Sequence, residues 1–234
     1  MKEKTFRFKG FEVLQQEGVH KVGTDGVLLG AWFLPHDEDH ILDIGTGTGV
    51  IALMAAQRTA AKVTAIDPDV AAVAVAGENF RRSPWYGRLI STTGRVQDLE
   101  AQHQFSHILS NPPFFVDSLL PDDPARLRQR HAMDLTFTDL ISSVVRLLTP
   151  DGRFSVILPR IEGEQFSAIA MAAGLTLSRL CKVHPREGKP AHRLLMEFSR
   201  VKTALQAEVI HIHGPDGTYS TEYRLLTRDF YLGF

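Results

Sequence analysis

The chain has 234 residues, of which 44% are hydrophobic and 23% charged, and its formal net charge is -1. This composition is typical of a globular protein and excludes a polycation, so a nucleic-acid partner would need a local basic surface. No apolar run approaches the ~20 residues that span a bilayer and the N-terminus has no signal-peptide core, which predicts no membrane association. The single cysteine, Cys181, excludes an intramolecular disulfide and favours a cytoplasmic location.

The first 34 residues predict a small hairpin followed by a buried helix. Apolar and polar side chains alternate over residues 5–13, with a turn near Gly10. The polar residues 23–26 precede the apolar run Val27–Trp32. We therefore expect Thr24 or Asp25 to cap the N-terminus of this helix.

The rest of the chain alternates apolar strand-like runs with helical patterns. Strands are expected at residues 41–44, 62–66, 88–93, 105–110, 153–158, 175–183 and 193–201, with helices between most of them. This order predicts an α/β fold with a doubly wound, Rossmann-like, seven-stranded and mostly parallel sheet. The last two strands have no helix between them, so they should pair antiparallel at one edge. We expect one domain and a monomer, with the hairpin and helix in 1–34, the core in 35–201 and a tail packing on it in 202–234.

A strand that ends in glycines at alternate positions, Gly45, Gly47 and Gly49, leads directly into a helix. Such a loop brings a nucleotide close to bare backbone, although some glycine loops serve only close packing. Its third glycine comes one residue earlier than in the dinucleotide-binding pattern. Asp67, at the end of the next strand, can accept both ribose hydroxyls of a nucleoside or can instead cap the following helix. The loop and this carboxylate together predict a nucleoside site.

The motif Asn111-Pro112-Pro113-Phe114 follows the fourth expected strand, beside the glycine loop at the point where the strand order reverses. The Asn111 side chain and the Pro112 carbonyl, stiffened by the prolines, offer two acceptors for the protons of an amino group. Phe114 offers a flat face for a planar group. The alternative is an Asn-Pro turn followed by a core phenylalanine.

Together these motifs resemble the class I S-adenosylmethionine-dependent methyltransferases that act on planar amino groups. The stretch Lys21–Trp32 and the closing residues 227–232 narrow the resemblance to the bacterial tRNA1(Val) adenine-N6 methyltransferase family, which acts on adenosine 37 beside the anticodon. The resemblance runs from about Phe6 to the C-terminus. It implies S-adenosylmethionine as cofactor and the anticodon loop of a tRNA as partner.

The resemblance also implies roles for the matching residues. The catalytic residues would be Asn111, Pro112, Pro113 and Phe114. The cofactor contacts would be Thr24, Asp25, Asp43, Gly45, Gly47, Gly49 and Asp67, with Asp43 orienting the loop or the cofactor's amino group. Related enzymes often have an acidic residue where this chain has Arg95, so contact with the cofactor's adenine is expected from Val96 or Asp98.

A basic cluster follows the Asn-Pro-Pro-Phe motif. Arg126, Arg128 and Arg130, together with Lys21, are expected to hold RNA phosphates, unless they are ordinary solvated charges. His211 and His213 would share one face of a strand. With a single cysteine and no further spaced ligands, they predict no metal site.

Three other functions fit parts of the sequence. Guanine-N2 methyltransferases of ribosomal RNA share the Asn-Pro-Pro-Phe motif, but they usually carry an additional N-terminal domain that this sequence does not include. Protein-glutamine N5 methyltransferases tend to have tyrosine at the position of Phe114. A non-catalytic RNA-binding module with a cofactor fold is disfavoured by the glycine loop, Asp67 and Asn111.

Overall fold

The computed structural model describes residues 4–35, 40–100, 102–113 and 135–234. The strands of its main sheet are β3 (His40–Ile44), β4 (Lys62–Asp67), β5 (Leu89–Thr93), β6 (Phe105–Ser110), β7 (Leu148–Pro159), β8 (Thr176–Arg186), β9 (Arg193–Ser199) and β10 (Gln206–His213). The helices are α1 (Thr24–Trp32), α2 (Val50–Arg58), α3 (Val70–Arg81), α5 (Phe137–Leu147), α6 (Arg160–Ala172) and α7 (Thr221–Thr227).

The main sheet has the strand order β10-β8-β9-β7-β6-β3-β4-β5. β9 is antiparallel to both of its neighbours, and the other adjacent pairs are parallel. The order reverses at β3, which lies between β4 and β6, as a doubly wound sheet requires. The α/β, Rossmann-like fold predicted from the sequence is confirmed, as is the antiparallel pairing of β8 with β9.

Two details of the sheet differ from the prediction. The described sheet has eight strands instead of seven, because β10 pairs in parallel with β8. The antiparallel strand β9 lies inside the sheet, between β7 and β8, and β10 takes the edge position beside β8. In β10 only Ile210 and Ile212 are buried hydrophobics, so its sequence shows too short an apolar alternation to identify a strand.

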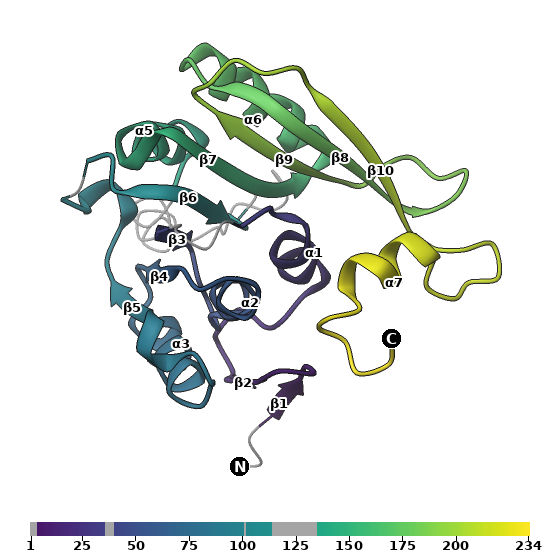
Figure 1. Ribbon diagram of the computed structural model, residues 1–234, viewed down its shortest axis with the longest axis horizontal. Coiled ribbons are helices and arrows are strands. Elements are labelled where there is room, and N and C mark those ends of the chain that lie inside the picture. The colour runs from purple at the N-terminus through teal and green to yellow at the C-terminus, as the bar shows by residue number, and fades with distance from the viewer. Residues whose placement is uncertain (1–3, 36–39, 101, 114–134) are drawn as a thin grey trace, which may run out of the picture.

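Helices cover both faces of the sheet (Figure 1). α1 and α2 pack with α3 on one face, and α5 and α6 lie on the other. Along β3, Ile41 belongs to the first core while Leu42 and Ile44 belong to the second, as the alternation of side chains in a strand requires. Among the described residues, no helix is long and apolar enough to cross a membrane.

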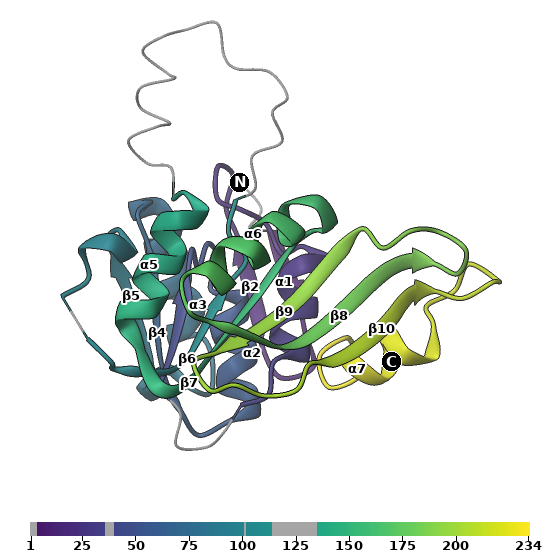
Figure 2. The ribbon, with the colours of Figure 1, turned by 90° about the horizontal axis from the view of Figure 1, so that it is seen from above.

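The predicted N-terminal hairpin is present as β1 (Lys4–Arg7) and β2 (Glu12–Gln15), which pair antiparallel. It contacts the C-terminal segment, where the Phe8 ring stacks on Tyr231 at 6.0 Å and the Lys9 N–H donates to the Phe230 carbonyl at 2.8 Å. Figure 2 shows β9, β8 and β10 side by side, with α7 beside β10. The C-terminal segment therefore joins the hairpin to the edge of the main sheet.

The start of α1 corrects one prediction. Gly23 is the N-cap and provides no side-chain hydrogen bond, and Thr24 and Asp25 are already helical. Neither residue therefore caps the helix. The Asp25 carboxylate instead accepts a hydrogen bond from Arg193 Nε at 2.8 Å, which draws it away from the helix N–H groups.

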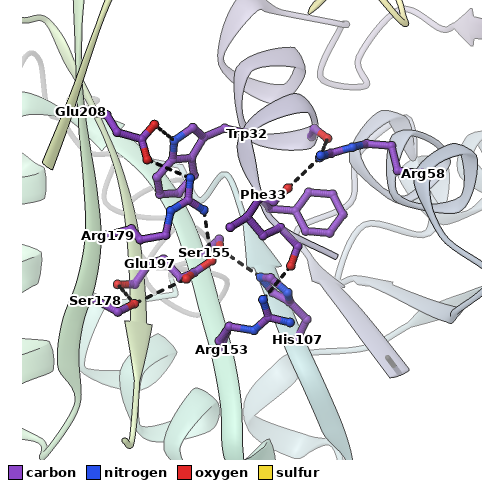
Figure 3. A network of polar contacts seen from close by, with 12 residues as sticks. Trp32, Phe33, Arg58, His107, Arg153, Ser155, Ser178, Arg179, Glu197 and Glu208 are labelled. Carbon is purple, nitrogen blue, oxygen red and sulfur yellow. Dashed lines mark hydrogen bonds and ion pairs between the residues drawn. The ribbon is translucent and has the colours of Figure 1, made fainter. Parts of the chain in front are cut away.

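The C-terminal end of α1 is fixed to the sheet by a polar network. Figure 3 shows the Arg179 guanidinium between the Trp32 indole, 4.1 Å from its ring centroid, and the carboxylates of Glu197 and Glu208. Arg179 Nη2 donates to Glu208 at 3.0 Å, and Arg179 Nη1 lies 3.6 Å from Glu197. The Trp32 indole N–H also donates to Glu208, at 3.2 Å. Because Arg179 and Glu197 are buried, the two charges depend on each other.

Replacing Arg179 with methionine should lower the free energy of unfolding by about 3–5 kcal/mol, because Glu197 is then a buried charge without its cation. Adding Glu197→Gln to Arg179→Met should recover part of this loss. Urea unfolding of the single and double variants measures both effects. A double variant as unstable as Arg179→Met would show that the isolated charge is not the cause.

Candidate functional site

A cavity of about 790 Å³ lies at the C-terminal ends of the parallel strands, within the size range of small-molecule sites. Its wall combines the start of α1, the loop after β3, the ends of β4, β5 and β6, and the start of β9. Of the predicted site residues, the wall includes Lys21, Thr24, Asp25, Gly45, Gly47, Asp67, Val96, Asn111, Pro112 and Pro113. These predicted residues therefore line one continuous cavity.

The three glycines of the loop serve two different purposes, although all have positive φ: 73° at Gly45, 53° at Gly47 and 81° at Gly49. A Cβ added at Gly45 would meet no atom within 4 Å, so the bare backbone faces the cavity. A Cβ at Gly49 would lie 2.6 Å from Phe80 Cε1 on α3. Gly49 does not line the cavity, and its lack of a Cβ allows α3 to pack against the loop; its contact with the cofactor stays a prediction.

Asp43 lies beneath the loop, completely buried and outside the cavity wall. Its Oδ2 accepts a hydrogen bond from the Thr46 hydroxyl at 2.7 Å, and its Oδ1 has no hydrogen-bond partner among the described residues. Burial raises the pKa of Asp43 to about 7, against the opposing effect of the Thr46 hydrogen bond. Of the two roles expected for Asp43, the geometry supports orientation of the loop.

Asp67 lies in the cavity wall and is oriented by the backbone. Its Oδ2 accepts from the Gly47 N–H and its Oδ1 from the Asp69 N–H, each at 2.9 Å. Burial raises the pKa of Asp67, and the two backbone hydrogen bonds oppose that shift. The cap of α3 is Asp69, whose side chain accepts from the Ala71 N–H, so Asp67 is directed to the cavity instead of capping the helix.

Beyond Asp67, the wall continues through Gly94, Arg95, Val96 and Gln97. Arg146 fixes this turn from below by donating to the carbonyls of Val96, Gln97 and Leu99. Val96 reaches the wall as expected. Asp98 does not: its side chain is 70% exposed and lies 3.9 Å from Arg95 Nε, so of the two expected adenine contacts the wall favours Val96.

Asn111 is brought to the glycine loop by the pairing of β6 with β3. Ser110 lies opposite Ile44 in the sheet and its hydroxyl donates to the Ile44 carbonyl at 3.0 Å. Asn111, Pro112 and Pro113 then enter the wall directly beside Gly45. The remaining predictions for this region, Phe114, Arg126, Arg128 and Arg130, lie outside the described residues.

Sequence reasoning missed one charged pair in the wall. Arg193, at the start of β9, forms an ion pair with Asp25 at 2.8 Å, although 168 residues separate the two in sequence. The neighbouring His192 also lines the cavity, and its Nδ1 lies 3.0 Å from the Val183 carbonyl. Burial and the nearby Arg193 lower the pKa of His192. No local motif marks these residues, because only the antiparallel insertion of β9 brings them to the cavity.

The two histidines of β10 have other partners. His211 lies 3.6 Å from Glu222, and the His213 ring stacks on Tyr219 at 5.2 Å. In the part of the chain that the structure describes, no group of three or more His, Cys, Asp or Glu side chains is arranged to hold a metal ion.

The fold is Rossmann-like, and the family match identifies the chain as a methyltransferase. The sequence pattern of the Methyltransferase small domain family matches residues 22–167, which is more than half of the chain. The fold is also similar to that of a predicted O-methyltransferase from Agrobacterium tumefaciens, with a TM-score of 0.69 and 19% identity over 88% of this chain and 96% of that one.

Two curated relatives are similar over almost their whole length. The tRNA1(Val) (adenine(37)-N6)-methyltransferase of Vibrio vulnificus is 43% identical, over 99% of this chain and 97% of the relative. The protein of the same name from Dyadobacter fermentans is 40% identical, over 98% of both chains. The chain belongs to the tRNA1(Val) (adenine(37)-N6)-methyltransferase family, and its cofactor is S-adenosylmethionine.

The buried carboxyl of Asp43 gives a pH-dependent prediction. The folded protein keeps Asp43 protonated up to about pH 7, whereas the unfolded chain releases that proton near the ordinary pKa of 3.8. Between these values the folded state binds more protons, so Asp43 makes the protein less stable as the pH rises. Relative to the wild type, Asp43→Asn should gain up to roughly 4 kcal/mol of unfolding free energy between pH 4 and 8. Urea unfolding across this range measures the difference, and parallel pH profiles would contradict the prediction.

The two loop glycines should respond differently to alanine. Gly49→Ala adds a methyl group against Phe80 to an unfavourable φ, so it should destabilise the fold by about 2–4 kcal/mol. Gly45→Ala adds only the strain of positive φ, about 1–2 kcal/mol, but its methyl group enters the cavity and should weaken binding of S-adenosylhomocysteine. Thermal unfolding and titration calorimetry separate the effects. If both variants lost the same stability and Gly45→Ala bound S-adenosylhomocysteine as tightly as the wild type, the two glycines would not have the separate roles assigned to them.

Proposed function

We propose that this protein transfers a methyl group from S-adenosylmethionine to the N6 amino group of adenosine 37 in the anticodon loop of tRNA1(Val). The observation that carries the proposal is the placement of Asn111 and Pro112 at the end of β6, in one cavity wall with Gly45, Gly47 and Asp67. The activity printed for the relatives, at 40–43% identity over nearly the whole chain, supports the same reaction.

The wall suits an adenosine with an amino-acid tail. Gly45 has bare backbone facing open space, and Asp67 holds a carboxylate in place with two backbone N–H groups. We assign Asp67 to the ribose hydroxyls, Val96 to the adenine, and Gly45, Gly47 and Thr24 to the methionyl part. When bound, the cofactor supplies a methyl group already activated by a sulfonium, so no covalent enzyme intermediate is required.

The protein's own part of the chemistry is to prepare the amino group. An aromatic amine delocalises its lone pair into the ring and is a weak nucleophile. The Asn111 side-chain oxygen and the Pro112 carbonyl would accept its two protons and favour a pyramidal nitrogen. The lone pair then points away from both acceptors, and orientation for in-line attack supplies much of the rate. The proton leaves only after nitrogen has become positively charged, so a dedicated general base is not needed.

The target base must leave its stack to enter the cavity. Unstacking costs a few kcal/mol in a duplex and less in a loop, so an anticodon loop is a favourable substrate. We propose that Phe114 stacks on the base and that Lys21, Arg126, Arg128 and Arg130 contact RNA phosphates. A cytoplasmic location and a monomeric state stay predictions from the sequence.

A guanine-N2 methyltransferase of ribosomal RNA is the second candidate, because the same Asn111 and Pro112 acceptors would serve any planar amino group. The two functions differ in the RNA that accepts the methyl group. An adenine-N6 enzyme should label an unmodified tRNA1(Val) transcript and leave protein-free ribosomal RNA unlabelled. The opposite pattern would replace the proposed function with the alternative.

Replacing Asn111 with alanine should lower kcat on the tRNA transcript by at least about 100-fold, because one of the two acceptors that orient the amine is lost. The dissociation constant for S-adenosylhomocysteine should stay within about threefold, since Asn111 is not assigned to the cofactor. Single-turnover methylation and calorimetry measure the two quantities. Gln102→Ala, an exposed amide outside the cavity wall, is the control. Near-normal turnover of Asn111→Ala would refute its role.

A further inference from the structure

The strand order divides the cavity into two sides. The ends of β3, β4 and β5 carry Gly45, Asp67 and Val96, the residues assigned to the cofactor. On the other side of β6, the wall is formed by the start of β9 and the end of β10, with His192, Arg193 and Ile212. Because Asn111 lies at the end of β6, between the two sides, the acceptor base must enter from the β9 side.

The polar group on the acceptor side is the Asp25–Arg193 pair. Arg193 Nε donates to Asp25 Oδ2 at 2.8 Å, and Arg193 Nη1 donates to the His192 carbonyl at 3.1 Å. The two side chains are 23% and 21% exposed, so both reach the cavity surface. The pair joins the first turn of α1 to the start of β9. Its geometry is therefore fixed from both sides of the cavity.

The backbone beneath Arg193 is also fixed. The His192 Nδ1 lies 3.0 Å from the Val183 carbonyl on β8, and the His192 N–H donates to the same carbonyl at 2.9 Å. Since a carbonyl only accepts, Nδ1 carries the proton of the neutral ring. The guanidinium thus has a stable support on β8 and β9. A rigidly held guanidinium suits recognition of an acceptor at a defined position.

We infer that Arg193, oriented by Asp25, is a positioning and specificity residue for the target adenine, to which it donates a hydrogen bond at a ring nitrogen beside the amino group. This inference rests on the proposed function. A guanidinium has only donors, so its partner in the base must be an acceptor. Adenine presents an acceptor on both sides of its amino group, N1 on one edge and N7 on the other. Guanine presents an N1–H donor on one side of its N2 amino group and the N3 acceptor on the other, so a guanidinium on the N1 side is repelled by guanine and accepted by adenine.

The inference changes the role of Asp25. The family resemblance placed Asp25 among the cofactor contacts, whereas its carboxylate forms an ion pair with Arg193. Asp25 then acts on the acceptor base through Arg193. Loss of either residue should impair methylation of RNA more than cofactor binding.

The first test compares Arg193→Gln with Arg81→Gln, which removes the same charge at the end of α3 remote from the cavity. With an anticodon stem–loop RNA containing adenosine 37, Arg193→Gln should lose about 10–100-fold in kcat/KM, the worth of a hydrogen bond to a charged group. Arg81→Gln should match the wild type. S-adenosylhomocysteine should bind Arg193→Gln within about threefold of the wild type, and a large loss of this affinity would overturn the inference.

The second test changes the base instead of the protein. Two further stem–loop RNAs carry 1-deazaadenosine or 7-deazaadenosine at position 37, which replaces one ring acceptor with a C–H group. The wild type should lose about 10–100-fold with one of the two analogues, and Arg193→Gln should show no such difference for the same analogue. Asp25→Asn, which retains the guanidinium, should show an intermediate sensitivity. Equal sensitivity of the wild type and Arg193→Gln to both analogues would overturn the inference.

The controls separate this inference from the proposed function. If the wild type forms no N6-methyladenosine in the unmodified stem–loop, the proposed function fails and the inference fails with it. If the wild type methylates the RNA but is insensitive to both deaza analogues, only the role of Arg193 is refuted. Thermal unfolding of each variant, with and without S-adenosylhomocysteine, confirms that a loss of rate comes from folded protein.

Discussion

The site depends on the pairing of β3 with β4 on one side and β6 on the other. Parallel strands end at the same edge of a sheet, so this pairing brings three segments together that are far apart in the sequence. The loop after β3 supplies bare backbone, the end of β4 supplies the Asp67 carboxylate, and the end of β6 supplies Asn111. The Ser110–Ile44 hydrogen bond fixes the register of β6 against β3 directly before Asn111 and Gly45. The first turn of α1 and the start of β9 complete the cavity wall beside this edge.

The glycine loop is held from below and from the side by two carboxylates. Asp43 holds it through Thr46, and Asp67 holds it through the Gly47 N–H. Both carboxyl groups are largely withdrawn from water, which raises the pKa of each. Burial of a carboxyl costs stability unless hydrogen bonds compensate for it. The protein therefore sacrifices some stability at neutral pH to keep the loop in one conformation for the cofactor.

The sequence predicted the parts of the site that depend on local chemistry. Glycines at positive φ, a carboxylate ending a strand and an Asn-Pro-Pro motif each have a short-range signature, and the strand order follows from the alternation of strands with helices. Residues that tertiary packing alone brings together were missed or misassigned. Arg193 reaches Asp25 only because β9 inserts antiparallel between β7 and β8. Position 49 requires glycine because the Phe80 ring, on the helix α3, leaves no room there for a Cβ. Asp98 was expected near the cofactor because it is the first acidic residue after Arg95, where related enzymes often have an acidic side chain. The short helical turn at 96–98 directs its side chain to solvent.

The central claim is that the acceptors at the end of β6 receive the amino group of an adenine. The most direct measurement is the identity of the methylated nucleoside. Unmodified tRNA1(Val) transcript is incubated with the protein and isotopically labelled S-adenosylmethionine, digested to nucleosides and analysed by mass spectrometry. The structure and the family predict labelled N6-methyladenosine, and a transcript with guanosine in place of adenosine 37 should stay unlabelled. Labelled N2-methylguanosine, or N6-methyladenosine that persists in the substituted transcript, would contradict the account.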